Sequence, residues 1–201
     1  MKSLLKRITG KKEPIILVSG LPRSGTSLMM KMLAAGGIPP MTDQVRTADD
    51  DNPQGYYEYE RAKKLHEGDT AWLPEARGRA VKTISALLEH LPADFEYRVV
   101  FMRRAMPEIL ASQRQMLINR GEDPDKMDDA EMAGIFEAHL KKVMDWLAAQ
   151  PNFSVLYINY NDLVADPEDQ IDRLQNYFGG RLDRAGMTAV VDPELYRQRH
   201  L

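Results

Sequence analysis

The chain has 201 residues, with 27 Lys and Arg, 30 Asp and Glu, and a formal net charge of -3. Its apolar and charged fractions, 43% and 28%, exclude the collagen-like, disordered and supercharged classes. The sequence contains no cysteine, which excludes disulfides, thiolate nucleophiles, zinc–thiolate sites and iron–sulfur clusters. The slightly acidic balance argues against a general nucleic-acid partner.

The length predicts one domain over residues 1–201. Residues 1–13 form a basic arm that lacks the apolar core of about 7–15 residues of a secretory signal. No run approaches the roughly 18 apolar residues of a membrane span. We therefore expect a cytoplasmic protein without a membrane span.

Strands and helices are expected to alternate along the chain. Residues 14–19 are a short apolar run that predicts a buried strand, and residues 26–35 predict a helix that Gly36 ends. The segment 38–55 is polar and rich in Pro and Asp, which indicates a long surface loop. A helix over 56–67 and a short strand over 81–84 are expected to follow.

The second half repeats this alternation. Strands are predicted over 97–102 and 153–159, and helices over 107–117, 130–149 and 166–178, with Pro107 as a first helical residue and Asp166 as an N-cap. Strands separated by helices predict parallel pairing. The expected fold is a three-layer α/β sandwich with a central parallel sheet, similar to the P-loop NTPases, with ligands beyond the carboxyl ends of the strands.

The loop after the first predicted strand has the features of a phosphate site. It reads Gly20-Leu21-Pro22-Arg23-Ser24-Gly25-Thr26-Ser27. Its glycines permit tight turns that point several N–H groups at one anion, and the helix N-terminus adds its positive end. The alternative is an ordinary turn between a strand and a helix.

This loop departs from the Walker A motif at one position. Thr26 stands where that motif requires Lys, and the cation is Arg23, inside the loop. Users of ATP also hold Mg²⁺ with an Asp at a strand end. The one candidate for such a metal-binding carboxylate is Asp162, which is equally suited to begin a turn. We therefore expect a nucleotide with one cradled phosphate and no metal.

A second anion site is predicted at the end of the strand 97–102. Arg103 and Arg104 follow this strand, and Ser112 lies eight residues after Arg104. Arginine at the carboxyl end of a strand can contact a phosphate through two N–H groups. The alternative is a pair of surface arginines and a neutral helical serine.

Three segments together resemble the sulfotransferase family: VSGLPRSGTS, FMRRAMPEILAS and VLYINYNDLVADP, within residues 14–180. The first is similar to the loop that binds the 5′-phosphosulfate of 3′-phosphoadenosine 5′-phosphosulfate (PAPS). The second is similar to the Arg-x7-Ser element that binds the 3′-phosphate. The third resembles a segment whose tyrosine lies near the adenine.

The resemblance implies a role for each matching residue. Arg23 takes the place of the loop's catalytic cation, and Gly20, Pro22, Ser24, Gly25, Thr26 and Ser27 complete the 5′-phosphosulfate site. Arg104 and Ser112 hold the 3′-phosphate, and Tyr160 approaches the adenine. Arg103, Arg197 and Arg199 either join the 3′-phosphate site or are surface charges.

The base that deprotonates the acceptor is predicted in Asn52–Glu60. This stretch resembles one found in many bacterial sulfotransferases, and its aromatic residues would desolvate a carboxylate. Glu58 is the first candidate for the base and Glu60 is the second. If the base is instead a histidine, as in some relatives, His66 is the nearest candidate. Lys82 either enters the same cleft or is a solvated strand lysine. The aromatic residues of the region either line an acceptor pocket or belong to the core: Tyr56, Tyr57, Tyr59 and Trp72.

The sequence thus predicts an enzyme that transfers a sulfuryl group from PAPS to a hydroxyl or amine of a small or polymeric acceptor. Two alternatives remain at this point: a P-loop kinase or nucleotidase, and a nucleotide-binding module without activity. The identity of the acceptor and the oligomeric state are not indicated by the residues.

Overall fold

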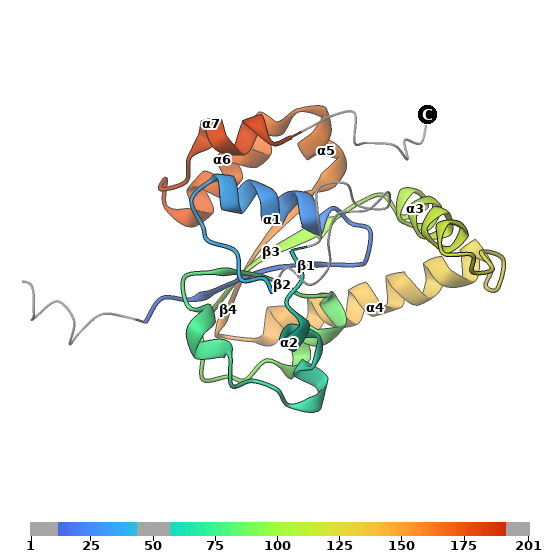
Figure 1. The fold of residues 1–201 in the computed structure, drawn as a ribbon, viewed down its shortest axis with the longest axis horizontal. Coiled ribbons are helices and arrows are strands. Elements are labelled where there is room, and N and C mark those ends of the chain that lie inside the picture. The colour runs from blue at the N-terminus through green and yellow to red at the C-terminus, as the bar shows by residue number, and fades with distance from the viewer. Residues whose placement is uncertain (1–11, 44–56, 192–201) are drawn as a thin grey trace, which may run out of the picture.

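The computed structural model describes residues 12–43 and 57–191 as a three-layer α/β sandwich around a parallel sheet (Figure 1). The sheet order is β2-β1-β3-β4. The strands are β1 Ile15–Gly20, β2 Ala80–Lys82, β3 Tyr97–Arg103 and β4 Phe153–Asn159. The predicted fold class is confirmed.

The central position of β1 follows from its sequence. All six residues of β1 are buried, because helices cover both faces of the sheet and β2 and β3 cover both edges of this strand. Leu17 pairs with Val81 of β2 and with Val99 of β3. A continuous apolar run is what a parallel strand buried on both faces requires.

Two apolar cores lie on opposite faces of the sheet. One contains Met29, Met30 and Leu174 and is covered by four helices: α1 Thr26–Ala35, α5 Tyr160–Ala165, α6 Pro167–Phe178 and α7 Arg184–Ala189. The other contains Trp72, Phe101 and Leu147. It is covered by α2 Glu60–Lys63, the 3₁₀ helices η2 Leu65–Glu67, η3 Leu73–Ala76 and η4 Ser85–His90, and α4 Asp129–Ala149.

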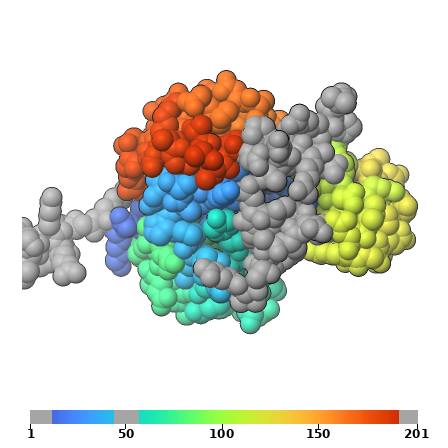
Figure 2. Space-filling model, turned by 45° about the horizontal axis from the view of Figure 1, so that its top comes forward, coloured from blue at the N-terminus to red at the C-terminus, as the bar shows by residue number. Residues whose placement is uncertain are grey.

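Helix α3, Met106–Asn119, and the start of α4 extend beyond the sheet, at the right of Figures 1 and 2. The side chain of Ile135 in α4 is 49% exposed. This exposure arises because that part of α4 lies past the sheet. Among the described residues, no helix has the length and apolar character needed to cross a bilayer.

Most element bounds agree with the sequence predictions, and the exceptions lie beside the site. The predicted helix 56–67 is reduced to α2 and η2, with residues 57–59 outside any helix. Asp162, which the sequence left as a possible start of a turn, lies instead in the first turn of α5, which Asn159 caps through its side chain. The predicted surface loop begins with buried residues, because Ile38 and Met41 pack against the body of the protein and Met41 N donates to Ala80 O.

The carboxyl end of β1 is a topological switch point, the position at which α/β folds form the crevice that binds ligands. The connection after β1 leads to β2 on one side, and the connection after β3 leads to β4 on the other side. The predicted phosphate loop, residues 20–25, follows β1 directly.

Candidate active site

Each strand of the sheet delivers at least one polar side chain to the crevice. Arg23 comes from the loop after β1, Lys82 ends β2, Arg104 follows β3, and Tyr160 follows β4. These residues are far apart in the sequence and meet because parallel strands end at the same edge of the sheet.

Two glycines of the loop are required by close approaches. A Cβ on Gly25, whose φ is +93°, would lie 2.3 Å from Tyr160 Cδ2. A Cβ on Gly20 would lie 2.7 Å from the carbonyl oxygen of Met102. Ser24 is buried, and its hydroxyl donates to Leu21 O at 2.7 Å, so it holds the turn together. Pro22 is exposed on the outside of the loop.

The backbone of the loop is also unusual at Arg23, which has φ of +68°. This left-handed conformation costs a non-glycine residue free energy and is found mostly in turns and functional loops. It directs the Arg23 side chain toward α3, where its Nε donates to Ser112 Oγ at 2.9 Å. The predicted loop cation and the predicted serine are therefore in direct contact.

The N-cap residue of α1 is Gly25, which has no side chain to cap the helix, and the first turn of α1 holds no acidic residue. In contrast, α4, α5, α6 and α7 each have an Asp or Asn cap that accepts a backbone N–H. The first N–H groups of α1 and its positive end, at Thr26 and Ser27, thus lie at the crevice, and the first turn of the helix itself carries no negative charge. This arrangement is suited to a bound phosphate.

Arg104 is held on three sides. Its Nη1 donates to Arg23 O at 3.0 Å, and its Nε donates to Glu108 Oε2 at 2.9 Å. Its Cζ lies 4.5 Å from the ring centroid of Tyr160. That ring is buried between Arg104 and Gly25, and burial raises the pKa of the Tyr160 hydroxyl. The side chain of Arg104 is only 8% exposed, which is incompatible with the alternative of a surface charge.

Arg103 points to the opposite face of the sheet. Its Cζ lies 4.1 Å from the ring centroid of Tyr157, and its Nη2 lies 3.0 Å from Met144 Sδ. Alternating side chains of a strand face opposite sides. Of the two neighbouring arginines, only Arg104 therefore contacts the loop.

Glu58 and Lys82 meet on the other side of the crevice. Lys82 Nζ donates to Ser27 Oγ at 3.0 Å and lies 3.9 Å from Glu58 Oε1. The side chain of Lys82 is 15% exposed, so the alternative of a solvated lysine is wrong. Lys82 thus connects the predicted base to the start of α1.

The surroundings of Glu58 differ from the predicted aromatic walls. Its Oε2 lies 2.7 Å from Lys63 Nζ, so two ammonium groups flank the carboxylate. Burial opposes the charge of Lys63, but hydrogen bonds to Glu58 and Glu60 outweigh it and raise the pKa of Lys63. Trp72 is fully buried, its Nε1 donates to Asp69 O, and Tyr59 packs edge-on against it. Both rings therefore belong to the core side of the region.

The other two candidate bases lie farther from the loop contacts. The side chain of Glu60 is 45% exposed and pairs with Lys63, while its backbone N donates to Asp43 Oδ2. His66 is 54% exposed, and its ring contacts Lys63 O, Glu67 and the ring of His90. Tyr56, Arg197 and Arg199 lie outside the described residues.

Three residues of the site were not predicted from the sequence: Lys63, Glu108 and Asn161. Lys63 could have been found as the lysine one helical turn after Glu60, a spacing that places opposite charges side by side. Glu108 stands four residues after Arg104, which is the same signal in a helix. Asn161 had no signal, because its contact with Glu108 joins two elements that are 53 residues apart.

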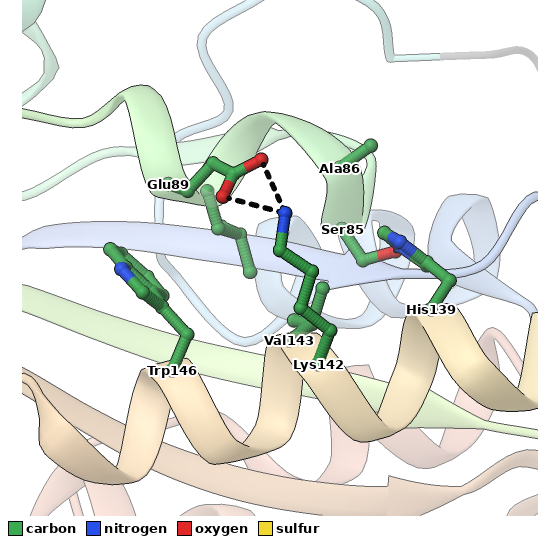
Figure 3. Close-up of a pocket in the computed structure, with 8 residues that line it drawn as sticks. Ser85, Ala86, Glu89, His139, Lys142, Val143 and Trp146 are labelled. Atoms are coloured by element: carbon green, nitrogen blue, oxygen red, sulfur yellow. Dashed lines mark hydrogen bonds and ion pairs between the residues drawn. The ribbon is translucent and has the colours of Figure 1, made fainter.

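The described residues contain no group of three or more His, Asp and Glu side chains placed to share a metal ion. Asp162 is exposed in the first turn of α5. A shallow pocket lies elsewhere, between η4 and α4, where Ser85 Oγ is 2.8 Å from His139 Nε2 (Figure 3). None of the predicted site residues lines this pocket.

Comparisons with solved structures support the fold. Sulfotransferase STF1 from Mycobacterium tuberculosis aligns with a TM-score of 0.58 at 16% identity, over 98% of this chain and 78% of that chain. STF9 from Mycobacterium avium aligns with a TM-score of 0.55 at 15% identity, over 94% and 70%. Mouse sulfotransferase SULT7A1 aligns with a TM-score of 0.51 at 17% identity, over 94% and 66%. At such identities the likeness establishes the fold alone.

A comparison of the sequence with curated proteins found no match. The sequence model of the sulfotransferase domain, in contrast, matches residues 13–193, which include every strand of the sheet and all the described residues of the crevice. The chain therefore belongs to the sulfotransferase domain family.

Proposed function

We propose that this protein transfers a sulfuryl group from PAPS to a hydroxyl or amine of an acceptor. The observation that carries the proposal is the contact between the two predicted anion sites, in which Arg104 donates to Arg23 O and Arg23 donates to Ser112. A donor with phosphates at both ends of one ribose needs two such sites side by side. Mouse sulfotransferase SULT7A1 was solved as a complex with PAP, which is adenosine 3′,5′-bisphosphate. This relative therefore supports a nucleotide with phosphates at both ends of the ribose.

The residues of the crevice fit such a donor. The N-terminus of α1, with Thr26, Ser27 and the backbone of residues 20–25, would hold the 5′-phosphosulfate. Arg104 and Ser112 would hold the 3′-phosphate, and Tyr160 would border the adenine. The bound donor supplies the sulfuryl group; the protein supplies position and charge.

Sulfuryl transfer requires that negative charge on the leaving phosphate be stabilised and that the acceptor lose a proton. Arg23 is permanently charged and a poor proton donor, so its contribution is electrostatic. The Lys82 ammonium lies at the start of α1, where it can add charge and a hydrogen bond. Glu58, which lies next to Lys82, would accept the proton of the acceptor.

Calorimetric titration with adenosine 3′,5′-bisphosphate and with AMP tests the 3′-phosphate site. Arg104→Ala removes a charge-assisted contact worth about 1.5–3 kcal/mol, so the preference for the bisphosphate should fall by about 10- to 150-fold. Arg103→Ala is the matched control, because this arginine faces Tyr157, and it should leave the preference unchanged. An unchanged preference in Arg104→Ala would refute the proposed site.

Two further titrations address the other function classes. A kinase or nucleotidase would bind Mg-ATP more tightly than the bisphosphate. A module without activity would bind the bisphosphate but transfer no sulfuryl group from PAPS to any of a panel of phenols, sugars and amines. Either result would contradict the proposal.

A further inference from the structure

The buried carboxylate of Glu108 contacts the guanidinium of Arg104. Glu108, in the first turn of α3, is 2% exposed. Its Oε2 accepts a hydrogen bond from Arg104 Nε at 2.9 Å, and its Oε1 accepts one from Asn161 Nδ2 at 2.8 Å. Burial of a carboxylate is costly unless its oxygens are paired, so each of these contacts is needed to keep Glu108 in place.

The contact with Asn161 defines which chemical group can stand at position 108. The backbone N–H of Ala105 donates to Asn161 Oδ1 at 3.1 Å, which turns the amide nitrogen of Asn161 toward Glu108. The side chain at 108 must therefore accept on both of its outer atoms, from Asn161 on one side and from Arg104 on the other. A carboxylate does this, whereas the amide of a glutamine has only one acceptor atom.

These contacts determine the plane of the Arg104 guanidinium. Arg104 Nε is fixed by Glu108, Nη1 is fixed by Arg23 O, and the flat face rests on Tyr160. The guanidinium is a rigid fork whose strength on a phosphate depends on its orientation. Glu108 also supplies the negative charge that allows two arginines to lie side by side in a partly buried crevice.

We propose that Glu108 is a positioning residue that orients Arg104 and thereby sets the preference for a nucleotide that carries a 3′-phosphate. This inference rests on the proposed function, because it acts through the 3′-phosphate contact of Arg104. A merely structural carboxylate would instead change stability, or affinity for every nucleotide alike. The distinguishing quantity is the ratio of the dissociation constants of AMP and adenosine 3′,5′-bisphosphate.

The test measures this ratio by calorimetry in four variants, with thermal melting as a check on folding. Glu108→Gln should lower the ratio by about 10-fold while the affinity for AMP stays within about twofold. Glu108→Asp keeps two acceptor oxygens and should recover part of the ratio. Asn161→Ala removes the hydrogen bond from α5 to Glu108 and should also lower the ratio. This variant keeps the test decisive if Glu108→Gln does not fold. Glu137→Gln, an exposed glutamate of α4, is the control and should leave the ratio unchanged.

A double variant identifies the route of the effect. In the Arg104→Ala background, Glu108→Gln should produce no further loss of the ratio, because the residue it orients is gone. A normal ratio in Glu108→Gln and Asn161→Ala, together with a reduced one in Arg104→Ala, would overturn the role of Glu108 alone. A normal ratio in Arg104→Ala would overturn the 3′-phosphate site itself, and the positioning role with it.

Discussion

The two sides of the crevice are built differently. On the phosphate side, which comprises Arg23, Arg104, Glu108, Ser112 and Tyr160, the contacts join residues up to 89 positions apart in the chain. On the acceptor side, which comprises Glu58, Lys63 and Lys82, Glu58 pairs with a lysine five residues away and with the end of the edge strand β2. The phosphate side is thus fixed by the sheet, whereas the acceptor side depends on the short helix α2.

The hydrogen bonding of buried polar side chains also differs between the two sides. Among the described residues, Glu108 has partners for both of its oxygens, whereas the hydroxyls of Ser19 and Thr83 are buried without a partner. Thr83 follows Lys82 at the end of β2, on the acceptor side, whereas Ser19 precedes Gly20 within β1. Buried polar groups are normally paired, so the hydroxyl of Thr83 is an unmatched group next to Lys82, while the buried carboxylate of the phosphate side is matched on both oxygens. Variants of the phosphate side should therefore alter nucleotide preference, and variants of the acceptor side should alter rate.

The largest expected effect separates binding from turnover. Glu58→Gln removes the proposed base and should lower the turnover rate by about 10²–10⁴. Affinity for adenosine 3′,5′-bisphosphate, measured by calorimetry, should remain normal, because Arg104 and Ser112 are untouched. Glu67→Gln, an exposed glutamate of η2, is the control and should retain the rate.

The same assay distinguishes the two neighbouring carboxylates. Glu60 shares Lys63 with Glu58, but its side chain is more exposed than that of Glu58. A severe loss of turnover in Glu60→Gln with a normal rate in Glu58→Gln would move the base from one to the other and contradict the assignment.

A smaller effect tests how rigid the phosphate side is. Gly25→Ala introduces a Cβ that would lie 2.3 Å from Tyr160 Cδ2 at φ of +93°. Backbone strain and overpacking should each cost about 1–3 kcal/mol of unfolding free energy, and the displaced ring should weaken nucleotide binding. Chemical denaturation and calorimetry measure the two effects separately.

Gly37→Ala provides a matched control for this substitution. Gly37 has nearly the same φ, +95°, but a Cβ there would meet nothing within 4 Å. It should therefore show the cost of the backbone alone, with normal nucleotide binding. Equal losses of stability and binding in the two variants would mean that the contact between Gly25 and Tyr160 has no special role.

The phosphate side was largely predictable from the sequence because its signals are local. Gly20 to Ser27 is one continuous loop, and Arg104 and Ser112 lie on one short segment, so their residue types and spacing are visible without the fold. The acceptor side was less predictable. An aromatic cluster in the sequence does not reveal which ring faces the core, and Trp72 was open to a pocket interpretation although it is fully buried.

Contacts between distant elements were not predictable for a different reason. Asn161 reaches Glu108 only because β4 is the neighbour of β3 and α5 begins directly after β4. The sequence left open that Asp162 begins a turn, since Asn and Asp are common in turns as well as at helix starts. The strand order, which determines these meetings, is a property of the whole sheet and has no local signal.

The smallest expected effect concerns pH and the pocket between η4 and α4, away from both sides of the crevice. Burial, aided by the nearby Lys142, lowers the pKa of His139, although Glu89 acts in the opposite direction (Figure 3). Because the folded pKa lies below the unfolded value of about 6.5, the unfolded chain takes up the proton first as the pH falls. Stability should therefore decline below about pH 6.5 by the uptake of at most one proton at this site. His139→Gln should flatten this decline in melting experiments between neutral and mildly acidic pH, while the nucleotide preference of the phosphate side stays unchanged. An identical decline in the variant would show that His139 does not account for the loss of stability at mildly acidic pH.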